Sequence, residues 1–425
     1  MAKYSEPAAI MAIGDSLYQG VRSLSIAADK ARHSVPAMVA AALGLPMSLP
    51  LMPRPILFDL EVILGQGALV HLIEAIRQVA LKNLDAWLKD PVWSTEEAFD
   101  NLALGGAAIT NLSADSFDAY WPTIPGLRDE LAANHGSITD VVTVIGKLWY
   151  ALNACFVLNP SRRSGTAQSA ASPIAQVAAR KPATLLVNIG SNEGLFDAGF
   201  TGSYDTAAKA SIAGIPDKMA ALAGDLAAAA PADCRIVINS LLRPRFIPNL
   251  YPRTDPDTFP GPDYYPSYIA YLGGADSIPA AALQAFDDQI AGVNAASKER
   301  MQAVLGARMV WVDVYDACDR FDGKHYADRF VEIPSAGIRL RNQPLEIIFG
   351  HFNRGGISGL DNMHPTVPGY AKLAEVVLAG MGSPQTLSID DAYAADTLLQ
   401  DLPPSYPLFQ LEIALLGSLG LFKGI

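Results

Sequence analysis

Cysteine is scarce in this sequence, and its three cysteines, Cys155, Cys234 and Cys318, lie far apart. They form neither a C-x-x-C metal pair nor the spacing of a disulfide framework, so both kinds of cross-link are excluded. Free cysteines are among the most buried residue types. We therefore expect the three thiols to be small hydrophobic groups inside the protein.

Charge is sparse as well, and positive charge is the scarcer kind. Asp, Glu, Lys and Arg make up 17% of the residues, and 43 acidic against 31 basic side chains give a formal charge of −12. An acidic chain repels phosphate backbones, so we expect no nucleic-acid partner. Hydrophobic residues make up 50% of the chain, which is enough for a large core.

Motifs of several enzyme classes are missing. The sequence has no G-x-S-x-G elbow, no P-loop and no H-E-x-x-H, and "GQGALV" at Gly65 lacks the third glycine of a dinucleotide fingerprint. A secretory leader is not visible either, because the residues before Gly14 are typical of a strand. We expect a cytoplasmic protein if this N-terminus is the native one, and a processed N-terminus is the alternative.

Two apolar stretches raise the question of a membrane. The charge-free stretch Ser34–Pro53 has the length of a span, but its four prolines interrupt helical hydrogen bonding. It predicts a short helix to Leu43 followed by a proline-rich strand or loop. The apolar tail, residues 401–425, ends in a segment too short to cross a bilayer, so we expect it to contact a membrane surface at most.

The remaining sequence alternates between short apolar runs and helical patterns. Such alternation predicts an α/β fold with a mainly parallel sheet. Strands are expected in residues 8–15, 183–192, 234–242 and 307–316. Helices are expected in residues 35–43, 67–88, 137–158, 216–230, 280–305 and 368–379, the last one capped by Thr366.

Two long connections break this alternation. We expect one domain over residues 1–400, with inserted loops at about 243–268 and 320–360. The first insertion carries seven prolines and six aromatic residues. Prolines lower the entropy lost on ordering, and aromatic faces suit acyl chains or sugar rings. The segment is either a wall of the substrate site or a surface loop whose aromatics pack on the protein body.

Polar residues follow the predicted strands. Ser16 follows the first strand and Asn192 the second, while "NLALGGA" supplies Gly106 and "DNMH" supplies Asp361 and His364 just before the last helix. Ligands of parallel sheets bind outside the carboxyl ends of the strands. If these segments share one rim, they bring together a hydroxyl, an imidazole, a carboxylate and an amide, which are the groups of an acyl-transfer site.

Each group has a chemical role in such a site. The Ser16 hydroxyl is a weak nucleophile and needs a base, which His364 supplies near neutral pH. Asp361 can accept from the other ring nitrogen and fix the tautomer. The backbone N–H groups of Ser16 and Gly106 and the side-chain amide of Asn192 can stabilise the oxyanion.

Taken singly, each of these residues has an ordinary explanation. Ser16 can cap a helix, Asn192 and the Gly105–Gly106 pair can form turns, and Asp361 with His364 can be a surface pair. The four together, in order and next to the right elements, favour a hydrolase. We expect Asp15 to hold the turn through backbone N–H bonds. We expect no carboxylate partner for the other histidines, His33, His71, His135, His325 and His351.

The sequence resembles the GDSL, or SGNH, family of serine hydrolases. "GDSL", "NLALGG", "GSNE" and "DNMHP" match the four blocks of that family in order. The resemblance implies a flavodoxin-like three-layer α/β/α fold and an esterase or lipase with no metal or organic cofactor. The family's nucleophile, oxyanion glycine, oxyanion asparagine and Asp–His pair map to Ser16, Gly106, Asn192, Asp361 and His364.

One position departs from the family pattern. Glu193 stands where the family usually has aspartate, and we expect this change to affect loop geometry more than chemistry. The expected substrate is a small-molecule or lipid ester. Rival functions are an acyltransferase with the same triad, a non-catalytic lipid- or glycan-binding protein on the same scaffold, and a membrane-surface interaction protein that uses the tail.

Overall fold

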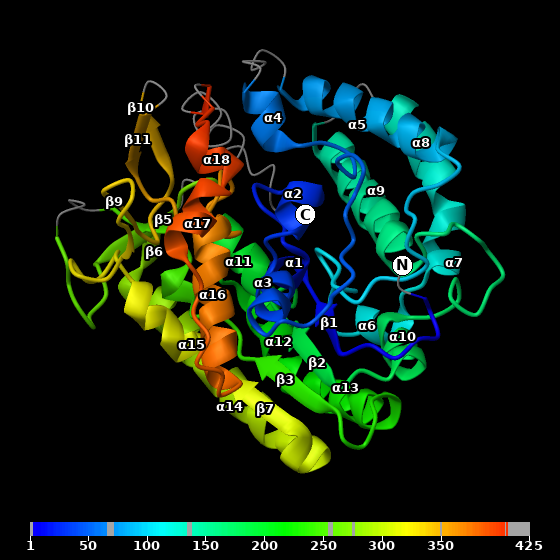
Figure 1. The fold of residues 1–425 in the computed structure, drawn as a ribbon. Helices are drawn as coiled ribbons and strands as arrows, with labels where there is room; N and C mark the ends of the chain where they lie inside the picture. Colours follow the sequence, from blue (N-terminus) through cyan, green and yellow to red (C-terminus); the bar gives the residue numbers. More distant parts are fainter. Residues whose placement is uncertain are drawn as a thin grey trace.

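The centre of the protein is a four-stranded parallel sheet with strand order β1-β2-β3-β7 (Figure 1). The computed structural model describes residues 3–65, 72–133, 138–253, 258–273, 277–348, 351–403 and 405–406. The strands coincide with the four predicted apolar runs, so the α/β prediction with a parallel sheet is confirmed. Their bounds are Ile10–Gly14 (β1), Thr184–Asn188 (β2), Arg235–Asn239 (β3) and Met309–Val312 (β7).

A fifth segment, which the sequence did not predict, lies along the free edge of β1. The Ala12 N–H donates to the Asp100 carbonyl at 2.9 Å, and the Leu102 N–H donates to the Ala12 carbonyl at 2.8 Å. Asn101 forms a parallel bridge with Ala12. If this segment counts as the second strand, the chain-order numbers across the sheet read 2-1-3-4-5, which is the order of flavodoxin-like sheets.

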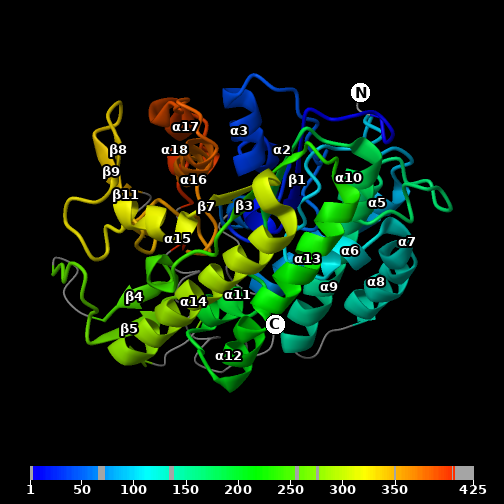
Figure 2. The same ribbon diagram turned by 90° about the horizontal axis from the view of Figure 1, so that it is seen from below.

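Side chains of alternate strand residues point to opposite faces, as the period of a strand requires. Met11 and Ile13 of β1 belong to one hydrophobic cluster, and Ile10 and Ala12 belong to the other. Figure 2 shows helices on both faces of the sheet, with α3 and α16 on one face and α9, α13 and α14 on the other.

The helices contribute to the two clusters as follows. The larger cluster includes residues of α5 (Leu72–Lys89), α8 (Ile124–Ala133), α9 (Ile138–Leu158), α10 (Pro173–Arg180), α11 (Leu195–Thr201), α12 (Thr206–Ala213), α13 (Ile215–Ala229) and α14 (Ala280–Leu305). The other includes residues of α1 (Ser16–Gln19), α3 (Val35–Ala42), α4 (Leu60–Gly65), α16 (Val367–Gly380) and α18 (Thr397–Gln400). Short helices in the connections are α2 (Ala28–Ala31), α6 (Asn111–Ala114), α7 (Phe117–Tyr120), α15 (Val314–Ala317) and α17 (Ile389–Ala394).

The predicted helices agree with these bounds where the structure describes them. Helix α3 ends at Ala42 and no strand follows it up to residue 53, so the proline-rich stretch is a loop. In α9, Asp140–Leu158 is long and apolar enough to cross a membrane, but 67% of its most apolar window is buried inside the protein. It packs against α5 and α8, and a buried core helix can have the same length and apolar composition.

The two long connections contain antiparallel strands, which corrects the expectation of loops. Strands β4 (Leu250–Pro252), β5 (Ser267–Ala270) and β6 (Ser277–Pro279) form one sheet, β8 (Val331–Ile333) pairs with β9 (Ile338–Leu340), and β10 (Glu346–Ile348) pairs with β11 (His351–Arg354). These strands have three or four residues, which is too short for an alternating pattern to stand out in the sequence. The division into residues 1–400 and a tail stays a prediction.

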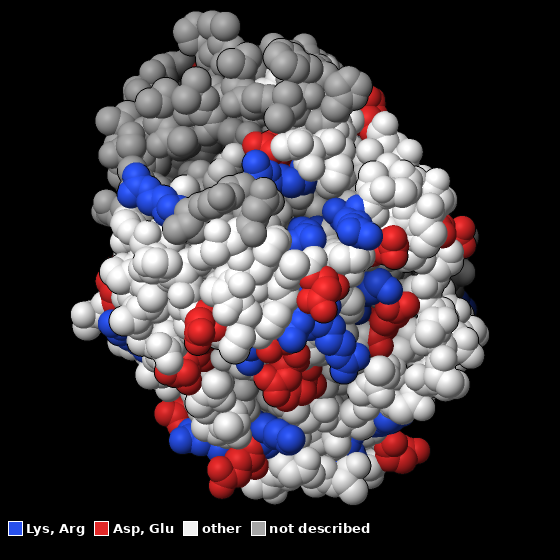
Figure 3. All heavy atoms as spheres, turned by 90° about the vertical axis from the view of Figure 1, so that its left-hand side faces the viewer, with Lys and Arg blue, Asp and Glu red and all other residues white. Residues whose placement is uncertain are grey.

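Most of the apolar tail, residues 401–425, lies outside the described residues. Only residues 401–403, 405 and 406 of it are described. The Tyr406 ring is buried, and its hydroxyl donates to the Leu360 carbonyl at 2.9 Å. All three cysteines are buried and free, as predicted, and burial raises the pKa of Cys234 to about 11. On the face shown in Figure 3, basic side chains are interspersed with acidic ones.

Candidate active site

A chain of two hydrogen bonds joins Ser16, His364 and Asp361. The His364 Nε2 atom lies 2.9 Å from the Ser16 Oγ, and His364 Nδ1 lies 2.7 Å from the Asp361 Oδ2. Ser16 and His364 are 8% and 5% exposed, and Asp361 is fully buried. The structure thus brings together three residues that the sequence places up to 348 positions apart.

The turn after β1 positions the Ser16 hydroxyl. Gly14 has φ +150°, and a Cβ there would lie 2.1 Å from the Asn188 carbonyl oxygen of the neighbouring strand. Asp15 caps α1, because its Oδ1 accepts from the Leu17 N–H at 3.2 Å and from the Asn188 side-chain amide at 2.8 Å. The predicted turn-holding role of Asp15 is therefore confirmed. Burial raises the pKa of the Asp15 carboxyl to about 6.

Asp361 is held by backbone donors as well as by His364. Its Oδ1 accepts from the N–H groups of Met363 at 3.0 Å and His364 at 2.9 Å, and its Oδ2 accepts from the Leu24 N–H at 2.8 Å. Burial works to raise the pKa of Asp361, but the neighbouring imidazole and these hydrogen bonds outweigh it and hold the pKa below its usual value. The carboxylate is thus oriented to accept from the ring.

The donor at Leu24 belongs to a strained turn that the sequence did not reveal. Ser23 and Leu24 both have φ 54°, in the left-handed region that non-glycine residues rarely adopt. The Ser23 Oγ donates to Glu61 Oε1 at 2.7 Å and accepts from the Leu360 N–H at 3.0 Å. Arg22 pairs with Glu61 at 2.7 Å. Two backbone hydrogen bonds of 3.0 Å between Arg22 and Ser25 close this turn. Its two central residues are serine and leucine, and not the glycine, asparagine or aspartate that mark such turns in a sequence.

Three groups are available to stabilise an oxyanion. Gly106 has φ +81°, and among the described residues neither its N–H nor that of Ser16 has a hydrogen-bond partner. The Asn192 side-chain amide donates one hydrogen to the Ala107 carbonyl at 2.9 Å, and its second hydrogen has no acceptor in the described part of the chain. This bond joins the loops that carry Gly106 and Asn192. The role of the three groups as oxyanion donors stays a prediction.

A buried amide pair fixes the glycine loop. The Gly105 N–H donates to Gln19 Oε1 at 2.7 Å, and Gln19 exchanges hydrogen bonds of 2.6 and 2.9 Å with Asn153 of α9. A Cβ at Gly105 would lie 2.5 Å from the ring of Trp149, so only glycine leaves room for this ring. Helix α9 thus supports the loop next to α1, through Gln19.

Glu193 ties the Asn192 loop to its neighbours. Its Oε1 accepts from the Ile109 N–H at 3.0 Å, and its Oε2 pairs with Lys218. The side chain is buried. These contacts agree with the interpretation that Glu193 affects the geometry of its loop more than the chemistry of the site.

One expectation about the other histidines is wrong. His325 does have a carboxylate partner, because its Nδ1 lies 3.1 Å from Asp322 Oδ1, and its Nε2 lies 2.9 Å from the Tyr268 hydroxyl. The signal was in the sequence, since Asp322-x-x-His325 repeats the spacing of Asp361-x-x-His364. His325 is fully buried and contacts a tyrosine instead of a serine, so it serves the packing of the inserted segments.

Comparison with known proteins adds little to this geometry. No family model and no curated protein sequence matches the chain. Among solved structures, the chain is similar to Axe2, an acetylxylan esterase from Geobacillus stearothermophilus, with 12% identity and a TM-score of 0.34; the match covers 91% of this chain and 100% of that one. A likeness at this level carries no argument about function. In the described part of the chain, no group of three or more His, Cys, Asp or Glu side chains is arranged to hold a metal ion.

Proposed function

We propose that this protein is a serine ester hydrolase of the GDSL type, with Ser16 as nucleophile, His364 as base and Asp361 as the residue that orients the base. One observation carries the proposal. The buried hydrogen-bonded chain from the Ser16 Oγ through the His364 ring to Asp361 lies at the carboxyl end of β1. Such a chain is the arrangement that activates serine for acyl transfer.

The reaction proceeds through an acyl-enzyme. The Ser16 Oγ attacks the ester carbonyl carbon while His364 Nε2 takes the hydroxyl proton. The negative charge on the carbonyl oxygen is stabilised by the N–H groups of Ser16 and Gly106 and by the Asn192 amide. The ester C–O bond then breaks as His364 returns the proton to the leaving alcohol. Water, deprotonated by His364, then attacks the carbonyl carbon of the acyl-enzyme. The bond from this carbon to the Ser16 Oγ breaks as His364 returns the proton to that oxygen, and the acid is released.

Two further features support assignment to the SGNH type. The order 2-1-3-4-5, with residues 100–102 as the second strand, is that of a flavodoxin-like sheet. The four motif blocks occur in order, and Ser16, Asn192 and His364 each lie next to a strand end or a helix start. A small-molecule or lipid ester is the substrate class that this proposal implies.

The decisive test is the Ser16→Ala variant. In another serine hydrolase, loss of the nucleophile lowers kcat about a million-fold. We expect loss of p-nitrophenyl ester hydrolysis with an unchanged far-UV spectrum and melting temperature, and labelling of Ser16 alone by a fluorophosphonate. Ser113→Ala, at an exposed serine, is the matched control and should keep full activity. More than a few per cent residual activity, or labelling at another serine, overturns the assignment.

A further inference from the structure

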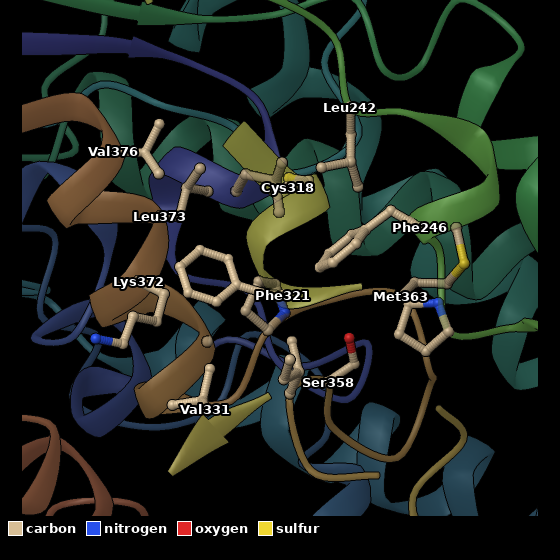
Figure 4. A pocket seen from close by; sticks show the side chains of 15 residues that line it. Leu242, Phe246, Cys318, Phe321, Val331, Ser358, Met363, Lys372, Leu373 and Val376 are labelled. Atoms are coloured by element: carbon tan, nitrogen blue, oxygen red, sulfur yellow. The ribbon is translucent and has the colours of Figure 1, made fainter. Parts of the chain in front are cut away.

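An apolar pocket lies beside the proposed catalytic residues. Its lining includes Leu17, which follows the nucleophile, and Met363 and Pro365, which flank the base. Figure 4 shows the rings of Phe246 and Phe321 projecting into the pocket. Residues adjacent in sequence to both proposed reacting residues, Ser16 and His364, thus line the pocket.

The pocket walls come from distant parts of the chain. Phe246 ends the short 3-10 helix Pro244–Phe246 of the first insertion, and Phe321 ends the 3-10 helix Cys318–Phe321. Leu373 and Val376 of α16 also contribute. Polar lining is limited, and the Lys372 ammonium is engaged by Glu375 at 2.8 Å. Its carbon stem, and not its charge, therefore faces the apolar side chains (Figure 4).

Buried polar bonds fix the backbone around Phe246. The Arg245 N–H donates to Asp287 at 2.9 Å, the Phe246 carbonyl accepts from the Asn342 amide at 3.0 Å, and the next carbonyl accepts from Lys324 at 2.7 Å. Three consecutive residues are thus held by side chains from other segments. A wall fixed in this way gives the pocket a defined depth before any ligand binds.

We propose that this pocket binds an unbranched hydrocarbon chain of the substrate ester and that Phe246 limits the length of that chain. The proposal rests on the proposed function for the reacting end of the ester. An apolar lining offers few partners to sugar hydroxyls, whose unpaired burial is costly, whereas each buried methylene is favourable. Each added methylene should raise kcat/KM about fourfold until the chain reaches the Phe246 ring.

The test is a series of p-nitrophenyl esters from acetate to dodecanoate. Phe246→Ala should move the optimum to longer chains by at least about two carbons, because truncation of a ring that projects into the pocket leaves space there. Val376→Trp should shorten the optimum by filling the pocket. Both variants should keep acetate hydrolysis within about threefold of the parent, since the reacting groups are untouched.

Phe259→Ala is the matched control. Phe259 belongs to the same insertion but does not line the pocket, and its ring lies 5.3 Å from the Arg341 guanidinium. Its chain-length profile should equal that of the parent. An unchanged profile in Phe246→Ala and Val376→Trp, or a uniform decrease for all esters, overturns the proposal.

Two further experiments distinguish a failure of the pocket proposal from a failure of the proposed function. Acetates of straight-chain alcohols, compared with the first series, show whether the acyl or the alcohol chain enters the pocket. Calorimetric binding of decanoate to the Ser16→Ala variant tests the pocket without catalysis, and Val376→Trp should weaken it at least tenfold. Decanoate binding in a protein that hydrolyses no ester overturns only the proposed function. If hydrolysis depends on Ser16 but the pocket variants change neither the chain-length preference nor decanoate binding, only the proposal about the pocket is overturned.

Discussion

Asp15 carries a buried carboxylate directly before the proposed nucleophile. Its pKa is about 6 in the folded protein against an ordinary value of 3.8, with burial as the main cause. The folded state therefore binds a proton more tightly, and the contribution of Asp15 to the free energy of unfolding falls by about 3 kcal/mol as pH rises from about 4 to 6. The hydrogen bonds that the Asp15 carboxylate accepts from the Leu17 N–H and the Asn188 amide both reach Oδ1, an oxygen that an asparagine retains.

We therefore expect Asp15→Asn to stabilise the protein at pH 8 and not at pH 4. Urea unfolding of the parent and the variant at both pH values measures the difference. A gain of the same size at both pH values would contradict a titrating Asp15.

Asn192 is the side chain for which the proposed mechanism predicts a role specific to the transition state. Asn192→Ala should lower kcat about 100-fold or more with a much smaller change in KM. The hydrogen bond from its side-chain amide to the substrate oxygen strengthens as negative charge develops on that oxygen. Steady-state kinetics on a short p-nitrophenyl ester measure both constants. A variant that mainly raises KM would show that Asn192 binds the ground state.

At the scale of elements, helix α9 supports the loop that carries Gly106. Asn153→Ala removes the partner of Gln19, which in turn accepts from the Gly105 N–H. Small displacements of catalytic groups cost up to about 100-fold in rate, so we expect kcat to fall about tenfold or more with little change in KM. Lys147→Ala on an exposed position of α9 is the control and should keep parental kinetics. Unchanged kcat in Asn153→Ala would show that the loop carrying Gly106 keeps its position without support from α9.

The elements differ in how far the sequence predicts them. Strand β1 is a continuous apolar run ending in glycine, and Ser16 follows it after Asp15, so the element and the candidate site residue were both predictable. The segment around Asn101 was missed, because it joins the sheet through one bridge and a few bonds. The turn at Ser23–Leu24 was missed because serine and leucine rarely adopt a positive φ, and because Glu61 and Asp361, which also hold it, lie 38 and 337 positions away.

The same limit applies to the first insertion. Its composition raised the idea of a wall near the substrate, but the sequence does not say which aromatics take part. Tyr265 and Tyr268 are buried and bonded to the protein body, while Phe246 lines the pocket. Replacing the whole segment would also leave Lys324 buried without its acceptors, so single substitutions are the better probe.

At the scale of the whole molecule, a buried ionic cluster joins three distant regions. Arg22 pairs with Glu61 of α4 at 2.7 Å and with Asp396, next to α18, at 3.3 Å. Burial works to raise the pKa of Glu61, but Arg22 and Lys30 outweigh it and lower the pKa to about 2 from 4.5. The resulting stability is present above about pH 4.5 and is lost as pH falls through 2.

Glu61→Gln should therefore destabilise the protein at pH 7 by about 3 kcal/mol, and the difference from the parent should shrink toward pH 2. Urea unfolding between these pH values measures the trend. Asp217→Asn, in an exposed ion pair with Arg300, is the control and should change stability by less than about 1 kcal/mol. A Glu61→Gln effect that does not depend on pH would contradict the ionic explanation.

The distance along the chain between the reacting groups has a consequence for synthesis. Ser16 and His364 are 348 positions apart, and the orienting Asp361 also lies in the late part of the chain. A ribosome adding about 5–20 residues per second leaves a nascent chain with its serine but without its imidazole for roughly 20–70 s. During that interval the emerging protein has a hydroxyl with no base to deprotonate it. If the proposed function holds, ester cleavage begins only after residues 361–364 have left the ribosome and lie against Ser16.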